Sequence, residues 1–107
     1  MEWKSLPFGY HKTDYNVRCF YRDGKWGPLE VSESEYISVH IASTALHYGQ
    51  EAFEGMKAYM GKDGKIRLFR WEDNANRFIR SANGVLMAPV PVELFREAIF
   101  KAVNLNK

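Results

Sequence analysis

The sequence predicts an α+β domain of two layers, in which two helices cover one face of a mostly antiparallel sheet. Two observations predict this class. Towards the N-terminus, apolar residues alternate with polar ones around Asp-Gly turns, whereas in the C-terminal third they recur at helical spacing. The chain has 107 residues, so a single domain is expected to hold both kinds of element.

The N-terminal half predicts irregular structure followed by short strands. Residues 1–16 have no periodicity. The segment VRCFYRDGKWGP predicts a hairpin, whose first strand runs from Val17 to Tyr21 and returns at Asp23-Gly24. The segment YISVHIAS, residues 36–43, is rich in β-branched and aromatic residues and predicts a further short strand.

The middle of the chain predicts a helical turn and then a second hairpin. Gly49 and Gly55 bracket a segment long enough for about one and a half helical turns. In GMKAYMGKDGKIRLFR, strands on both sides of an Asp63-Gly64 turn alternate apolar and polar residues, which predicts a hairpin with one buried face. Its alternating apolar residues are Met56, Ala58, Met60, Ile66 and Leu68.

Two helices are predicted after this hairpin, joined by the linker APVP. Glu72 and Asp73 stand in the first turn of the first helix, where carboxylates favour the helix dipole, and Gly84 marks its end. Both helices carry an apolar stripe at i, i+3, i+4, i+7 spacing. The stripes are Ala75, Phe78, Ile79 and Ala82 in the first helix, and Leu94, Phe95, Ala98, Ile99 and Ala102 in the second.

Composition excludes several functional classes. The net charge is +2 and the basic residues form no block, which gives little support to nucleic-acid binding. The single cysteine, Cys19, excludes an internal disulfide and a multi-cysteine zinc site, and it favours a reduced, cytoplasmic setting. The N-terminus lacks the apolar run of a signal peptide, and VLMAPVPV is too short to span a membrane.

No metal site is expected. The histidines His11, His40 and His47 lie far apart in the sequence and have no cysteine or carboxylate at metal-ligand spacing. Glu51 and Glu54 are close together, but two carboxylates alone do not define a metal site.

Four charged residues are candidates for other chemistry. Glu54 fits a buried hydrogen-bond organiser and a solvated strand edge equally well. Lys57 is a formal candidate for a Schiff-base lysine, but alternation places it away from Met56, towards water. Arg77 and Arg80 fall opposite the apolar stripe of their helix. On pattern alone this favours a solvated face over an anion clamp.

Three blocks taken together, STALHYGQEAFEGMKAY, GKIRLFR and NANRFIRSA, resemble the branched-chain amino acid aminotransferases. These are fold-type IV enzymes that use pyridoxal 5′-phosphate. The resemblance extends from about Phe8 to Lys107 and is most specific from Ala45 to Ala82. It implies that residues 1–107 are the N-terminal small domain of a two-domain enzyme. The larger domain, which carries the Schiff-base lysine, is absent from this chain, so the chain alone is expected to be inactive.

The resemblance also implies roles for the charged residues. Arg77, in NANRF, matches the arginine that holds the cofactor phosphate, which reverses the prediction made from the pattern alone. Glu54 and Lys57, in FEGMKAY, are expected to support the site by ion pairing or hydrogen bonding. The lysine form of this block is similar to the eukaryotic-type branch of the family. No catalytic residue is expected within the chain.

The substrate-binding residues implied by the resemblance are aromatic. Tyr48, in LHYG, matches a tyrosine that lines the substrate pocket and can reach the neighbouring subunit's site in a homodimer. Phe53, in AFEG, and Phe8, in PFG, match aromatics of the pocket wall for a branched aliphatic side chain. The expected reaction transfers the amino group of leucine, isoleucine or valine to 2-oxoglutarate, as part of branched-chain amino acid biosynthesis.

Two other functions stay open at this point. One is another class IV enzyme, either a D-amino acid aminotransferase or an aminodeoxychorismate lyase, which shares the phosphate arginine but usually differs in the HYG…FEG block. The other is a free-standing interaction module, which the aromatic content of 15% would also suit. The isolated domain is expected to expose apolar surface that would normally meet the larger domain or a second subunit, and therefore to self-associate.

Overall fold

The computed structural model describes residues 10–107, and the structural statements below refer to this part of the chain. Every strand pairing in it is antiparallel, and the predicted α+β class is confirmed. In chain order the elements are β1 (Asn16–Arg18), β2 (Tyr21–Arg22), β3 (Lys25–Trp26), β4 (Glu30–Ser32), α1 (Thr44–His47), β5 (Ala58–Met60), β6 (Ile66–Leu68), α2 (Trp71–Gly84) and α3 (Val92–Leu105).

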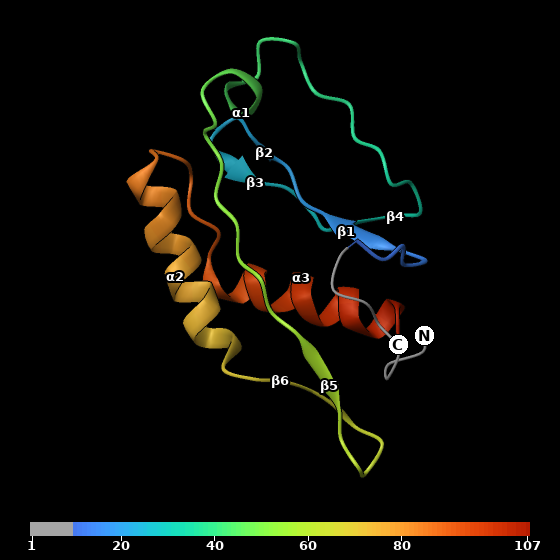
Figure 1. The fold of residues 1–107 in the computed structure, drawn as a ribbon. Helices are drawn as coiled ribbons and strands as arrows, with labels where there is room; N and C mark the ends of the chain where they lie inside the picture. The colour runs from blue at the N-terminus through green and yellow to red at the C-terminus, as the bar shows by residue number, and fades with distance from the viewer. Residues whose placement is uncertain (1–9) are drawn as a thin grey trace.

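The strands form three separate two-stranded sheets, which pair β1 with β4, β2 with β3, and β5 with β6. Each strand has only two or three residues, fewer than the about 5–6 residues of a typical strand. The helical layer is better developed: α3 packs against both α2 and β1. In Figure 1, α2 stands close to vertical at the left while α3 runs close to horizontal beneath β1 and β4.

The first predicted hairpin is present but shorter than expected. β2 and β3 pair around Asp23 and Gly24, whose φ angles of 53° and 79° are those of a two-residue hairpin turn. Val17 does not belong to this hairpin, because it lies in β1 and pairs with Val31 of β4. The predicted strand from Val17 to Tyr21 is therefore divided between two sheets.

The second predicted hairpin is confirmed. Ala58 pairs with Leu68, and Met60 pairs with Ile66. Within the turn, Oδ1 of Asp63 accepts a hydrogen bond from the backbone N–H of Lys65 at 3.1 Å. The face that carries the apolar residues is only half-buried, and Met60 at its end is exposed.

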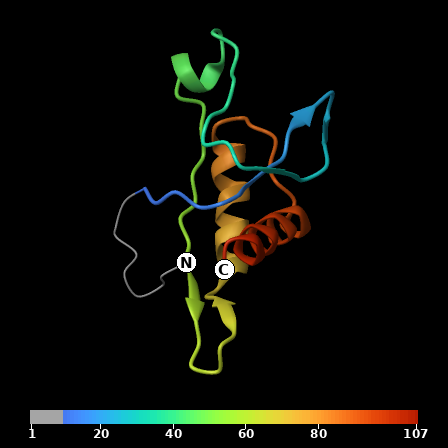
Figure 2. The same cartoon turned by 90° about the vertical axis from the view of Figure 1, so that its right-hand side faces the viewer.

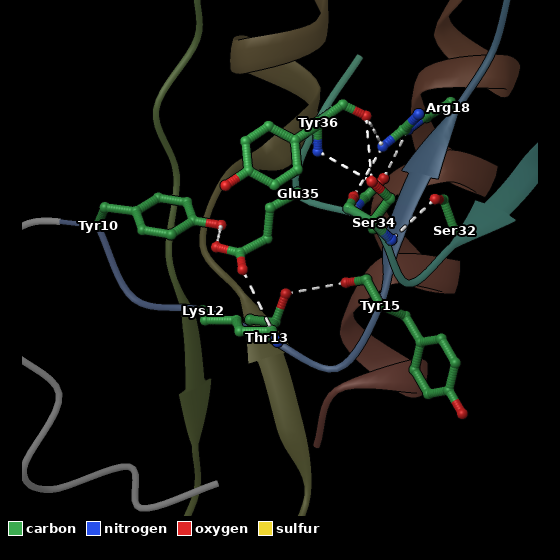
Figure 3. Close-up of polar contacts among 10 residues, drawn as sticks. Tyr10, Lys12, Thr13, Tyr15, Arg18, Ser32, Ser34, Glu35 and Tyr36 are labelled. Atoms are coloured by element: carbon green, nitrogen blue, oxygen red, sulfur yellow. Dashed lines mark hydrogen bonds and ion pairs between the residues drawn. The ribbon is translucent and has the colours of Figure 1, made fainter.

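The strand predicted over residues 36–43 is absent, so that prediction was wrong. β-branched and aromatic residues form a strand only where a partner completes the ladder, and β4 pairs with β1 no further than Ser32. Side chains of β1 hold this segment instead. Arg18 Nη2 donates to the carbonyl oxygens of Ser34 at 2.7 Å and Tyr36 at 3.0 Å (Figure 3).

The helical turn expected between Gly49 and Gly55 was also misplaced. It lies earlier, as α1, and Gly49 follows it in the left-handed region with a φ of 62°. His47 of α1 contacts the carbonyl oxygen of Ile41 through Nε2 at 2.5 Å, so the preceding loop folds back on the helix. Residues 50–57 are irregular, and they run beside α2 in both Figure 1 and Figure 2.

Both C-terminal helices form as predicted, and their apolar stripes meet. The buried apolar side chains are Ala75 and Ala82 of α2 and Phe95 of α3. The ring centroids of Phe95 and Phe78 lie 5.9 Å apart. The Cα radius of gyration is 15.2 Å, against about 13 Å for a compact chain of this length. The core is therefore small, and much apolar surface stays outside it.

Candidate functional site

Segment 50–57, which carries several candidate residues, joins α1 to β5 alongside α2 (Figure 2). Its side chains alternate in burial. The side chain of Glu54 is largely buried and Met56 is half-buried, whereas Phe53 and Lys57 are exposed. Lys57 thus faces outward, as the alternation predicted. Glu54 faces inward, which brings its carboxylate to the surface of α2.

Glu54 is the centre of a polar cluster with two residues of α2. Arg77 Nε donates to Glu54 Oε2 at 2.8 Å, and Arg77 Nη2 donates to Oε1 at 2.5 Å. Asn74 Nδ2 donates to the same Oε1 at 2.9 Å and to the carbonyl oxygen of Gly55 at 3.1 Å. Asn74 and Arg77 are three residues apart, so they occupy one face of the helix. Of the two interpretations of Glu54, the structure shows the hydrogen-bonded one.

Burial within this cluster is asymmetric. The side chain of Glu54 is 9% exposed, whereas that of Arg77 is 55% exposed. Hydrogen bonds from Arg77, and a weaker contribution from Asn74, hold the pKa of Glu54 below its usual value although burial opposes them. The same bond raises the pKa of Arg77. Both groups are therefore charged at neutral pH, and the carboxylate lies beneath a guanidinium that faces outward.

The lowered pKa of Glu54 predicts a pH-dependent contribution to stability. The contribution is complete above the pKa of an unfolded glutamate, about 4.3, and is lost as pH falls through the lower folded-state pKa. We expect the free energy of unfolding to decrease in this acid range, and to decrease less in Glu54→Gln. Chemical denaturation at a series of pH values measures both.

A second carboxylate, Asp63, also affects the free energy of unfolding in acid and has to be separated from Glu54. Hydrogen bonds from Arg67 lower the pKa of Asp63 too, so Asp63 also contributes stability that is lost in acid. Only the difference between the wild-type and Glu54→Gln profiles reports on Glu54. Parallel profiles for the two proteins would contradict the assignment.

The aromatic candidates lie on open surface. Tyr48, the residue after α1, is 84% exposed, and Phe53 is 85% exposed. No interaction among the described residues joins either ring to Arg77. The third aromatic candidate, Phe8, lies outside the described residues. The described part of the chain therefore brings Glu54 and Arg77 together but leaves the rings without an enclosing wall.

Two residues of this region were not identified from the sequence. Asn74 could have been found, because it stands three residues before Arg77 on the same helix face. Gln50 had no such signal. Its Nε2 donates to the carbonyl oxygen of Val85 at 2.8 Å, and its Oε1 accepts from Thr44 Oγ1 at 2.6 Å. Gln50 therefore connects α1 to the C-terminal end of α2.

Replacing Gln50 by alanine should destabilise this connection. Two hydrogen bonds are lost at a part-exposed position, so we expect the free energy of unfolding to fall by ~0.5–1.5 kcal/mol. Amide hydrogen exchange should accelerate in α1 and change little in α3. Gln50→Glu is the matched variant, because a carboxylate cannot donate to Val85. Wild-type exchange in α1 of both variants would show that the bridge is unimportant.

Two surface hollows lie away from Arg77 and from the exposed aromatic candidates. A mainly apolar one of about 460 Å³ lies between β1, β5 and α3, and a polar one of about 190 Å³ lies near the chain end. Arg77, Tyr48 and Phe53 line neither of them. Within residues 10–107, no three His, Cys, Asp or Glu side chains are grouped as metal ligands. No helix of this part is both long and apolar enough to cross a bilayer.

Comparison with known proteins confirms the resemblance drawn from the sequence, although no protein-family model matches the chain. The chain is 46% identical over 107 residues to the branched-chain-amino-acid aminotransferase of Haemophilus influenzae, covering 100% of this chain and 31% of that protein. It is 38% identical over 107 residues to the enzyme of the same name from Helicobacter pylori, covering 100% and 32%. It is 38% identical over 104 residues to branched-chain-amino-acid transaminase 1 of Bacillus subtilis, covering 96% and 29%.

The chain corresponds to only part of each relative. The chain spans about 30% of the length of these curated relatives. It is consistent with a fragment of such a protein.

Proposed function

We propose that this chain, similar along its whole length to branched-chain aminotransferases, is the N-terminal small domain of a two-domain enzyme of that kind. The observation that carries the proposal is the placement of Arg77. This arginine lies in a block that resembles the phosphate-binding block of the family, and its guanidinium is both exposed and held in one orientation by Glu54.

The residues present fit the phosphate of pyridoxal 5′-phosphate. A guanidinium donates paired hydrogen bonds to phosphate oxygens, and Arg77 keeps part of its donor set directed to solvent. When bound, the cofactor supplies the electron sink for amino transfer. This chain contributes an anchor for the phosphate, while the Schiff-base lysine belongs to the larger domain, outside these residues.

The exposed aromatics are proposed to form the substrate side of the site. Tyr48 and Phe53 present nearly whole rings to solvent, an arrangement that suits contact with a second domain or subunit. Where a second domain or subunit covers this region, Phe53 would pack against the branched aliphatic side chain of the substrate. Phe8 is proposed for the same wall. Lys57, which is also exposed, would support the site by ion pairing or hydrogen bonding.

The substrates that we propose are leucine, isoleucine and valine, with 2-oxoglutarate as acceptor. An aromatic wall discriminates among aliphatic side chains by only ~1–3 kcal/mol per methylene, so all three are expected to react. We propose a cytoplasmic homodimer, in which Tyr48 reaches the partner's site. The exposed apolar surface around Tyr48 supports this association.

The test uses the natural protein that contains this chain, beside the 107-residue chain itself. We expect the full protein to convert leucine and 2-oxoglutarate to the products of amino transfer, and the chain alone to show no turnover. Turnover of D-alanine or formation of 4-aminobenzoate in place of this activity would favour another class IV enzyme. A reading frame that stops naturally after Lys107 would favour a free-standing interaction module. Either result would sink the proposal.

A further inference from the structure

Among the described residues, the Arg77 guanidinium donates hydrogen bonds from only one of its edges. An arginine offers five N–H donors in a planar fork. Glu54 accepts from Nε and from Nη2. Among the described residues, no hydrogen bond from Nη1 is present. One edge of the fork, formed by Nη1 and the outer hydrogen of Nη2, is therefore available to an anion from solvent.

Glu54 has a second partner besides Arg77. Asn74 donates to Oε1 of the same carboxylate, and its second bond, to the carbonyl oxygen of Gly55, holds it against the segment that carries Glu54. Because Glu54 is 9% exposed, removing its cation would leave a largely buried charge uncompensated. An anion that pulled Arg77 away would incur this cost, whereas an anion that binds the outer edge would not.

We propose that Glu54 is a positioning residue for Arg77, and that a phosphate monoester binds the Nη1 and Nη2 edge while Glu54 keeps the Nε edge. This inference rests on the proposed phosphate-binding function of Arg77. Two parallel N–H···O bonds from the outer edge match the geometry of a phosphate group. Since the guanidinium is already oriented, less side-chain freedom is lost on binding.

The experiment is an NMR titration of the 107-residue chain with inorganic phosphate, compared with chloride at equal ionic strength. The resonances followed are Nε–Hε and Nη of Arg77 and the carboxyl carbon of Glu54. We expect phosphate to shift Nη, while Nε–Hε and the Glu54 carboxyl carbon stay at their ligand-free positions. NMR detects weak binding, so the chain need not retain the anion.

A matched pair of variants tests the positioning role. In Glu54→Gln, we expect faster exchange of the Arg77 Nε hydrogen and a smaller phosphate-induced shift of Nη. Arg80→Gln changes an exposed arginine of the same helix and should leave both observations as in the wild type. The wild-type titration stands by itself if Glu54→Gln does not fold.

The possible outcomes of the titration and of the Glu54→Gln variant test different parts of the proposal. If Nε–Hε and the Glu54 carboxyl carbon shift together with Nη, phosphate displaces Glu54, and the assignment of the two edges is wrong while Arg77 remains the anchor. If Glu54→Gln behaves as the wild type, Glu54 does not position Arg77. If phosphate shifts no nitrogen of Arg77, the outer edge is not an anion site and this inference fails, whereas the proposed function is tested by cofactor binding of Arg77 variants in the full-length protein.

Discussion

Replacing Arg77 by glutamine is expected to weaken the binding of pyridoxal 5′-phosphate by about 10–100-fold in the proposed full-length enzyme. The substitution removes the charge-assisted bonds to the phosphate, and glutamine cannot provide a bidentate cationic donor. The cofactor's absorbance, followed in an equilibrium titration of the apoprotein, measures the dissociation constant. Transaminase activity should then depend on added cofactor in the variant more strongly than in the wild type.

Two further substitutions separate binding from folding. Arg77→Lys preserves a cation for Glu54 but not the planar fork, so we expect it to fold and to show an intermediate loss of cofactor affinity. Arg80→Gln, on the same helix, should bind the cofactor as the wild type does. Wild-type affinity in both Arg77 variants would remove Arg77 from the cofactor site.

Replacing Phe95 by alanine is expected to cost roughly 3–5 kcal/mol of unfolding free energy. Phe95 is 7% exposed and is the only large apolar side chain among residues 10–107 that is classed as buried. It connects α3 to α2 by packing its ring against Phe78. Native domains have total stabilities of about 5–15 kcal/mol, so the variant should lose a large fraction of its stability.

Urea denaturation followed by circular dichroism measures this loss. The matched control is Phe69→Ala, because Phe69 is 73% exposed and should change stability by no more than about 0.5 kcal/mol. Equal effects of the two substitutions would show that the contact between α2 and α3 does not hold the domain together.

The contact between Phe78 and Phe95 also affects the candidate site, because it holds α2 in place. Asn74 and Arg77 contact Glu54 only while α2 stands beside segment 50–57. The face of α2 opposite to Arg77 is the face that α3 covers, through Phe78 and Phe95. Loss of Phe95 is therefore expected to disturb the Arg77 and Glu54 pair although neither residue touches the substituted position.

Strong local patterns predicted most elements correctly. The apolar stripe that includes Ala75 and Ala82 predicted α2, and both residues are buried. The Asp23-Gly24 and Asp63-Gly64 pairs predicted both hairpins. Asp23, Gly24 and Gly64 have left-handed backbone angles, which glycine and aspartate adopt more readily than most residues, and Asp63 accepts a hydrogen bond within its turn. In these cases the deciding interactions lie within a few residues of one another, so a single sequence contains them.

Predictions that needed a distant partner were less successful. Residues 36–43 have the composition of a strand, but no neighbouring segment pairs with them, and Arg18 holds their start from another element. Gln50 gave no local signal, because its importance depends on Val85, 35 residues away. Strand pairing and side-chain bridges depend on which segments the fold brings together, and periodicity does not contain this information.

The sequence by itself determined the helices, the two turns and the outward direction of Arg77, since each follows from spacing along one element. Its resemblance to a known family also indicated what Arg77 would bind. Only the tertiary structure decided that the Glu54 carboxylate lies beneath Arg77 and also accepts a hydrogen bond from Asn74. Glu54 and Arg77 lie 23 residues apart. Their contact exists because segment 50–57 packs beside α2, and no local pattern determines that packing.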